Sequence, residues 1–188
     1  MEKGAERVAV FIDGRNFYHS TKKLKDIFDI KLQDIVYKLV GNRELATVYY
    51  YNALLDEKQN PITYKKHNEF LNVLIKIPKF KVILCDVRKI KNEDGNFSYE
   101  VKGDDVYLAH DLLMGAFDNL YYLAIIISGD ADFIPVIDTV RKRFKKKVGN
   151  GFFRRTSSYK LRQARDFSVN LNKLIRNLNQ DKEASVPS

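Results

Sequence analysis

The chain has 188 residues, 45% of them hydrophobic and 30% charged, a balance typical of one globular domain that buries its own core. Its only cysteine, Cys85, excludes an internal disulfide and a cysteine-based zinc site, and its apolar neighbours predict a buried residue. No apolar run approaches the ~18 residues of a membrane span, and the N-terminus lacks the apolar stretch of a signal peptide, so we expect a cytoplasmic protein.

The net charge of +9 is concentrated in one part of the chain. Residues 141–165, called the basic segment below, hold eleven Lys or Arg and no Asp or Glu, and subtracting these eleven charges leaves −2 for the rest. Phe144, Phe152, Phe153 and Tyr159 lie among them. This mixture favours a surface for a polyanion such as RNA, and the alternative is a solvated helix end and loop that only aids solubility.

The first half of the chain alternates predicted strands and helices, which favours an α/β fold with a parallel sheet. Strands are predicted at 7–13, 46–55 and 81–87. Helices are predicted at 16–25, 31–40 and 63–77. Residues 88–101 resemble a hairpin with Asp94-Gly95 as its turn.

The second half continues the alternation without an internal repeat or a linker. Strands are predicted at 121–128 and 146–153. Helices are predicted at 104–117, from near Asp132 to Phe144, and at 157–178. We therefore expect a single domain over residues 1–179, followed by a flexible C-terminal tail, 180–188.

The first predicted strand, within VAVFIDGRNFY at 8–18, ends at Asp13. Gly14 permits a tight turn or the close approach of a ligand, and Arg15 and Asn16 follow on the loop or first helical turn. Ligands of parallel sheets gather outside the carboxyl ends of the strands, so Asp13 is a candidate cation ligand, with Asn16 orienting a water or phosphate oxygen. Taken alone, Asp13 is better explained as a cap of the following helix.

The strand predicted at 121–128 ends in a second acidic motif, SGDADF at 128–133. Ser128 and Gly129 form the turn, and Asp130 and Asp132 lie two residues apart. One of the two acids can cap the following helix while the other faces the cleft. Capping accounts for Asp132 and leaves Asp130 to be explained by binding.

A third acidic motif, KGDD at 102–105, opens the helix predicted at 104–117. Asp104 and Asp105 point in different directions, so at most one should reach a shared cation, and either can serve as the helix N-cap. Lys102 can hold a phosphate. Asp111 lies six residues beyond Asp105, ~9 Å along a helix and ~120° around it, and is the weaker candidate.

Convergence of these acids would require a counter-charge, since two like charges at ~4 Å repel by ~4 kcal/mol at an effective dielectric of ~20. A divalent cation supplies that charge, and oxygen-only ligands favour Mg²⁺ or Mn²⁺. The three histidines have no metal-ligand spacing, and neither a P-loop nor a dinucleotide-binding glycine pattern is present. The acids therefore point to metal-assisted phosphodiester chemistry.

Three ordered motifs, FIDGRNFY, KGDDVYLAHDLL and IIISGDADFIPVI, resemble the signature of NYN domains. They are most similar to the LabA-like branch within the PIN-like nuclease superfamily, and SSYKLRQARDFSVNL resembles its closing segment. The resemblance covers about residues 6–175. It implies a Rossmann-like three-layer α/β/α sandwich with a mainly parallel five-stranded sheet, and Mg²⁺- or Mn²⁺-dependent cleavage of RNA.

The resemblance also implies the roles of individual residues, with Asp13, Asp105, Asp130 and Asp132 as metal ligands and Asn16 as their catalytic partner. Asp104 occupies a variable position of the second motif, and Asp111 matches another acid common in the family. We expect RNA to be held by five basic side chains: Arg15, Lys102, Arg154, Arg155 and Lys160.

Two other functions use the same residues. The domain can be a non-catalytic RNA-binding or regulatory module, although clustered carboxylates are of little use to a pure RNA binder. It can also be a phosphatase-type hydrolase of small phosphate esters, which would not need the long basic segment. Exposed strand edges and the C-terminal helix would permit a homodimer.

Overall fold

A computed structural model describes residues 6–22, 31–53, 57, 61–91, 95, 97–161 and 163–184. The strands are β1 (Arg7–Asp13), β2 (Glu44–Ala53), β3 (Phe80–Lys91), β4 (Phe97–Lys102), β5 (Leu123–Ile127), β6 (Lys147–Phe152) and β7 (Phe167–Asn170). The helices are α1 (Gly14–Thr21), α2 (Leu32–Val40), α3 (Pro61–Ile75), α4 (Asp104–Phe117), α5 (Ile134–Lys142) and α6 (Leu171–Ala184), with a short 3₁₀ helix, η1 (Ala131–Phe133).

The strands form one seven-stranded sheet in the order β4-β3-β2-β1-β5-β6-β7. All neighbours are parallel except β3 and β4, which form an antiparallel hairpin. From β1 the chain builds outward through β2 and β3 and then returns to the other side of β1 with β5. The gap between the ends of β1 and β5 is therefore a topological switch point, where α/β sheets bind their ligands.

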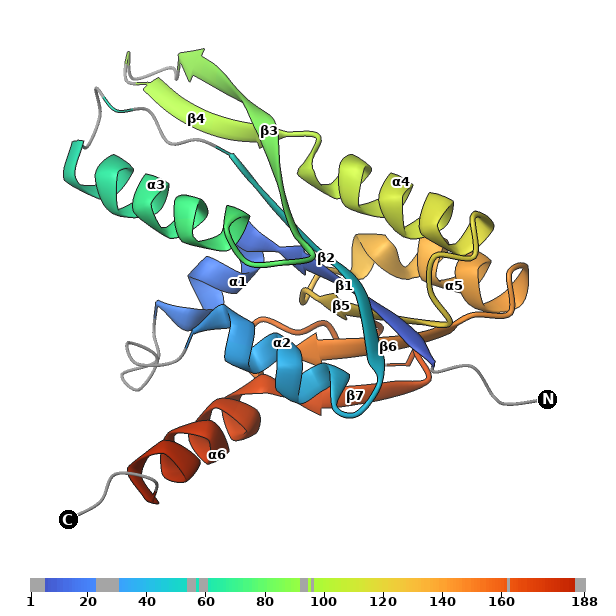
Figure 1. The fold of residues 1–188 in the computed structure, drawn as a ribbon. Coiled ribbons are helices and arrows are strands. Elements are labelled where there is room, and N and C mark those ends of the chain that lie inside the picture. Colours follow the sequence, from blue (N-terminus) through green and yellow to red (C-terminus); the bar gives the residue numbers. More distant parts are fainter. Residues whose placement is uncertain are drawn as a thin grey trace.

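Helices cover both faces of the sheet, as Figure 1 shows. Alternate residues of β1 face opposite layers: Val10 packs in the core with α1, α2, α3 and α6, and Phe11 packs in the core with α4 and α5. The central strands β1 and β5 are apolar along most of their length because both of their faces are buried.

The predicted α/β/α sandwich is confirmed, and the predicted hairpin is the β3–β4 pair. Two strands exceed the expected five. One is β4, the second hairpin strand. The other is β7, which lies within the helix predicted at 157–178. That prediction is wrong before Leu171 and is confirmed from Leu171 onward, where α6 begins. Pairing with β7 satisfies the backbone of β6 between Gly149 and Phe152, which would otherwise be an open sheet edge.

The remaining expectations divide between described and undescribed residues. Cys85 is buried, as predicted. The helix α6 continues to Ala184, inside the expected tail. Four expectations fall partly on residues outside those described: 23–25 of the first helix, 54–55 of the second strand, Asp94 of the turn and 185–188 of the tail. None of the described helices is long and apolar enough to cross a membrane.

The α4 side of the core gives a test of the fold. Leu112 is fully buried between α4 and the sheet, whereas Met114 on the same helix is 39% exposed. We expect Leu112→Ala to lower the free energy of unfolding by about 2–5 kcal/mol through lost burial and a residual cavity. Met114→Ala should change it by less than about 0.5 kcal/mol. Urea unfolding followed by circular dichroism measures both, and equal losses would contradict this packing.

Candidate functional site

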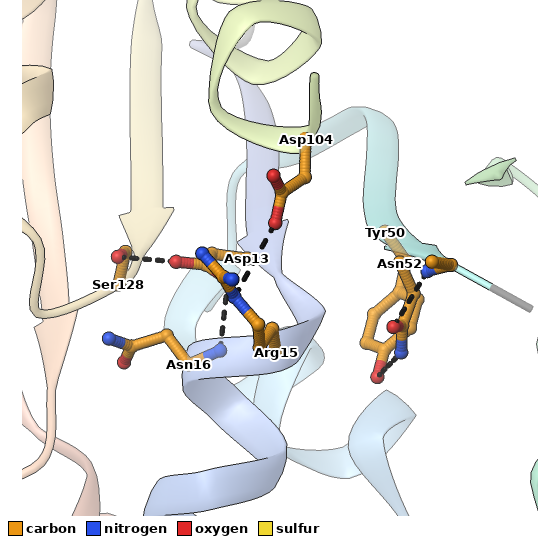
Figure 2. Close-up of polar contacts among 8 residues, drawn as sticks. Asp13, Arg15, Asn16, Tyr50, Asn52, Asp104 and Ser128 are labelled. Atoms are coloured by element: carbon orange, nitrogen blue, oxygen red, sulfur yellow. Dashed lines mark hydrogen bonds and ion pairs between the residues drawn. The ribbon is translucent and has the colours of Figure 1, made fainter. Parts of the chain in front are cut away.

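Asp13 lies at the carboxyl end of the central strand and is only 7% exposed. One of its oxygens, Oδ1, accepts a hydrogen bond of 2.9 Å from the Asn16 backbone N–H, which caps α1. The other, Oδ2, accepts one of 2.9 Å from the Ser128 hydroxyl at the end of β5 (Figure 2). Asp13 is thus the helix cap that its sequence position allowed, and it also joins the two strands of the switch point.

The loop after β5 is built around the same contact. The Ser128 hydroxyl also accepts a hydrogen bond of 3.1 Å from the Asp130 backbone N–H. Asn16 Oδ1 accepts one of 3.2 Å from the Gly129 N–H. The following η1 turn is capped by Asp130, which accepts a hydrogen bond of 2.9 Å from the Asp132 N–H. The prediction that Asp132 is the capping acid is therefore wrong. Asp132 itself is exposed.

The third acidic motif, KGDD at 102–105, approaches from the other side of β1. Gly103 precedes α4 with a left-handed φ of 88°, and neither neighbouring acid is the N-cap. Asp104 is buried, and its Oδ2 lies 3.6 Å from Nε of the half-exposed Arg15. Figure 2 shows the Arg15 side chain reaching from α1 toward Asp104 past Asp13. Asp105 is partly buried beside it.

The pKa values reveal the proximity of these acids. Burial, first, and then the charges of Asp104, Asp13 and Asp130 raise the pKa of Asp105 from 3.8 to about 6, against the opposing effect of Arg15. Burial and Asp104 also raise the pKa of Asp13, although the Asn16 N–H, the Ser128 hydroxyl and Arg15 oppose them. Asp13, Asp104, Asp105 and Asp130, called the acid cluster below, therefore share one negative potential.

Position 14 requires glycine because of close contacts within the protein. A Cβ there would lie 2.5 Å from the Tyr51 carbonyl oxygen and 2.8 Å from the Tyr50 ring. The close approach that requires glycine here is therefore between α1 and β2. The buried Tyr50 hydroxyl accepts from Asn52 Nδ2 at 3.3 Å, and burial, then the Asp13 charge, raise the pKa of Tyr50 despite that hydrogen bond (Figure 2).

The donor chemistry of the acid cluster fits a hard divalent cation, because it offers carboxylate oxygens whose mutual repulsion such a charge would relieve. Among the described residues, no three His, Cys, Asp or Glu side chains already stand together as a metal-binding group. Asp13, held by its two hydrogen bonds, could bind the ion where it stands, and the side chains of Asp105 and Asp130 would have to turn toward it.

Asp111 is engaged elsewhere. Its Oδ2 accepts a hydrogen bond of 3.0 Å from the buried Tyr51 hydroxyl, and its Oδ1 lies 3.1 Å from His110 Nδ1. Asp111 thus fixes α4 on β2, which sets the position of the first helical turn and its acids.

The sheet divides the basic segment into two parts. Because β6 is parallel to β5, its first residue Lys147 pairs with Leu123, at the amino ends of the strands and so at the end of the sheet opposite the acid cluster. The cations from Arg143 to Lys147 lie at that far end of the sheet. There Lys146 Nζ donates to Asn119 Oδ1, and Lys147 Nζ lies 5.3 Å from the centroid of the Tyr122 ring. Of the basic residues after β6, Arg154, Arg155 and Lys160 are exposed, and Arg162 lies outside the described residues.

The aromatic residues of the basic segment do not form one surface. Phe152 and Phe153 are buried, and Phe144 packs edge-on against Phe117. Only Tyr159 of the four is exposed, at 69%. The expectation of an interleaved basic and aromatic surface therefore holds only for the loop after β6.

The loop of residues 153–166, called the β6–β7 loop below, is fixed next to the acid cluster. The Ser158 N–H donates to the Gly129 carbonyl at 3.0 Å, and the Thr156 hydroxyl pairs with that of buried Ser20 at 2.7 Å. A Cβ at Gly129 would lie 1.9 Å from the Thr156 carbonyl oxygen, so only glycine fits. The loop therefore carries Arg154 and Arg155 close to Asp130. Lys102 ends β4, exposed and immediately before α4.

Two supporting residues were missed by the sequence argument. The hydroxyl of Ser128, assigned only to a turn, holds Asp13. Buried Asn150 in β6 donates from Nδ2 to the carbonyls of Ile126 at 3.0 Å and Ser128 at 2.9 Å, and so fixes the end of β5. The available signal was a polar residue between two glycines, Gly149 and Gly151, in an otherwise apolar strand.

A Rossmann-like sandwich with acids at its switch point defines a nuclease-type fold of the PIN-like kind. The model of the NYN domain matches residues 7–172, and the chain belongs to this nuclease-like family. A crystal structure of a protein of unknown function from Vibrio parahaemolyticus has the same fold, with a TM-score of 0.67 and 24% sequence identity over 91% of this chain and 96% of that one. No curated protein matches.

The raised pKa of Asp105 predicts a pH-dependent stability. Its pKa of about 6 in the native state exceeds the ordinary 3.8, so the metal-free protein is destabilised as the pH rises through this range and remains so above it. We expect Asp105→Asn to raise the free energy of unfolding by about 1 kcal/mol near pH 8, after allowance for solvent screening. This corresponds to a rise of about 2–4 °C in Tm. The difference in the free energy of unfolding should vanish at about pH 4, where the Asp105 carboxyl of the native wild type is protonated.

Thermal unfolding in EDTA at the two pH values measures this difference. Asp118→Asn, at the exposed opposite end of α4, removes the same charge away from the acid cluster. An equal effect of the two substitutions would attribute the gain to net charge and contradict the electrostatic coupling within the cluster.

Proposed function

We propose that this protein is a Mg²⁺- or Mn²⁺-dependent ribonuclease of the LabA-like branch. The observation that carries the proposal is the buried Asp13 at the switch point, with acids from two other chain segments raising one another's pKa beside it. Membership of a nuclease-like family supports the same conclusion. A binding module would gain nothing from this repulsion next to a polyanion.

In this proposal Asp13, Asp105 and Asp130 hold the cation, with Asp132 as a further ligand. The bound ion would lower the pKa of a water and offset negative charge on the phosphate. Ser128 and the Asn16 N–H keep the Asp13 carboxylate fixed, so that little reorganisation accompanies binding. The Asn16 side chain, anchored through its oxygen to Gly129, presents its amide N–H groups for a phosphate oxygen or water.

The substrate is assigned from the charges around this centre. Arg15 balances Asp104 in the metal-free protein and is half exposed, so it can also contact a phosphate. Arg154, Arg155 and Lys160 on the β6–β7 loop, with Lys102 before α4, extend the positive potential away from the acids. A polyanion would thus be bound by its backbone on both sides of the cleaved bond.

The first test of the proposal is Asp13→Asn. We expect RNA cleavage with Mg²⁺ or Mn²⁺ to fall at least about 100-fold, because an essential charged ligand is lost. RNA affinity in EDTA should be unchanged or higher, since a negative charge has been removed. A single-turnover assay with labelled single-stranded and structured RNA measures cleavage, and filter binding measures affinity.

Ser128→Ala provides a milder companion variant, because it keeps the Asp13 carboxylate and removes only the hydroxyl that holds it. A loss of about 10- to 100-fold is expected, by analogy with supporting shells of metal sites. Cleavage by folded Asp13→Asn at the wild-type rate would refute the ribonuclease assignment. Tight RNA binding without any cleavage by the wild type would favour the regulatory module instead.

The second test uses the division of the basic segment. Arg154→Gln with Arg155→Gln removes two charges beside the acid cluster, whereas Arg143→Gln with Lys145→Gln removes two from the far edge. We expect the first pair to weaken RNA binding about tenfold near 0.15 M salt and to lower the salt slope of log K by about 1.4, as two lost phosphate contacts on a single strand require. The second pair should leave both quantities nearly unchanged.

Hydrolysis of a small phosphate ester separates the remaining alternative. A phosphatase-type enzyme would cleave such an ester equally well with either pair of substitutions and would show no preference for RNA. Equal losses of RNA binding from the two pairs would mean that charge acts only at long range. That result would contradict a binding surface on the β6–β7 loop.

A further inference from the structure

One surface depression lies between α5 and the β6–β7 loop, outside the acid cluster. It measures about 510 Å³ and is lined by residues of α5 and the β6–β7 loop, among them Ile134, Asp138, Lys142, Tyr159, Lys160 and Gln163. This volume is within the range of ~300–1,000 Å³ typical of small-molecule and nucleotide sites. We propose that the depression binds one nucleotide of a single-stranded nucleic acid, with its base stacked on Tyr159 and a phosphate held by Lys160 and Lys142. The proposal rests on the proposed function and extends it to a site for the uncleaved part of the substrate.

Tyr159 has the properties of a stacking platform. At 69% it is the most exposed aromatic side chain in the described part of the chain, and large aromatic surface is costly to leave in water. Every base has a flat face, so stacking on an aromatic ring binds single strands with little sequence preference and contributes about tenfold or more in affinity per base. A base-paired strand cannot offer a free base face to this ring, so the site selects unpaired RNA.

The backbone on both sides of Tyr159 is anchored. Leu161, two residues beyond Tyr159, is fully buried in the α4–α5 core, and Ser158 donates to Gly129 at 3.0 Å. On the far side, Arg141 Nη1 donates to the Ala164 carbonyl at 2.7 Å. Anchors on both sides mean that little conformational entropy is lost when a base binds.

The charges around the depression suit a phosphate. Lys142 pairs with Asp138 at 2.7 Å, but both side chains are partly exposed, and such surface pairs contribute little, so Lys142 can turn to a phosphate oxygen. Arg141 is bound on two sides by Asp166, at 2.9 and 3.0 Å, and serves to hold the loop. Lys160 is exposed on the rim of the depression.

The depression also lies along a path to the acids. Ile134, which lines it, follows the η1 turn that begins at Asp130, and Ser158 joins Tyr159 to Gly129. A strand lying on Tyr159 would therefore continue past Asp132 and Asp130 toward Asp13. The site would hold a nucleotide beside the cleaved bond, which makes a single strand, rather than a duplex, the preferred substrate.

The test uses the absence of tryptophan from the chain. Tyr159→Trp places a single fluorophore on the platform, and Tyr37→Trp places one on α2, across the sheet, at a position 45% exposed. Both are titrated in EDTA, which prevents metal-dependent cleavage, with a single-stranded RNA of about eight nucleotides, its abasic counterpart and a duplex of the same length. We expect saturable quenching only for Tyr159→Trp, with the single strand and with neither the abasic strand nor the duplex.

Affinity provides a second readout. Tyr159→Ala should weaken single-strand binding about tenfold, while Tyr159→Phe, which keeps the ring, should bind as the wild type does. Equal affinity of the Ala and Phe variants, or equal quenching by the abasic strand, would overturn the proposal. These measurements do not depend on cleavage. Stacking in EDTA without any metal-dependent cleavage would refute the ribonuclease assignment and leave this site intact. Cleavage without stacking would refute this site and leave the ribonuclease assignment intact.

Discussion

The site depends on one buried carboxylate that holds the fold together and, in the proposed function, also binds the cation. Asp13 caps α1 through the Asn16 N–H and receives the Ser128 hydroxyl from β5, so it joins the two strands where the sheet changes direction. Burying a charged group is costly, and its two hydrogen bonds offset only part of that cost, since the pKa of Asp13 remains raised by burial. The remaining electrostatic cost is what a cation at this place could recover.

Arg15 explains how such a cluster can exist in the folded protein without an ion. Its guanidinium lies 3.6 Å from Asp104, the most buried acid of α4, and lowers the pKa of both Asp13 and Asp105. One positive charge does not balance four acids: burial, first, and then the charges of Asp104, Asp13 and Asp130 keep the pKa of Asp105 raised to about 6 against the effect of Arg15. The single arginine therefore reduces the repulsion enough for the protein to fold, and the negative potential that remains favours binding of a further positive charge.

The sequence was sufficient for the sandwich and for the proximity of the β1 and β5 ends, which carry Asp13 and Asp130, because the ends of neighbouring parallel strands lie together whatever the intervening loops do. It was insufficient where tertiary pairing outweighs local pattern. The spacing of Leu161, Ala164 and Leu171 is helical, yet β7 forms inside that segment because β6 needs a partner. The roles of Asp111, held by Tyr51, and of Asn150, which holds β5, likewise depend on contacts between distant segments that no periodicity reveals.

The basic segment shows most directly how topology converts a sequence feature into function. Its charges are continuous along the chain, but β6 runs from one end of the sheet to the other between Lys147 and Phe152, so the cations from Arg143 to Lys147 lie at the end opposite the acids. The residues directly after β6 lie at the same end as the acids, and Gly129 fixes them there because the Thr156 carbonyl occupies the space of its missing side chain. The direction of a single strand thus decides which half of a uniform charge run belongs to the site.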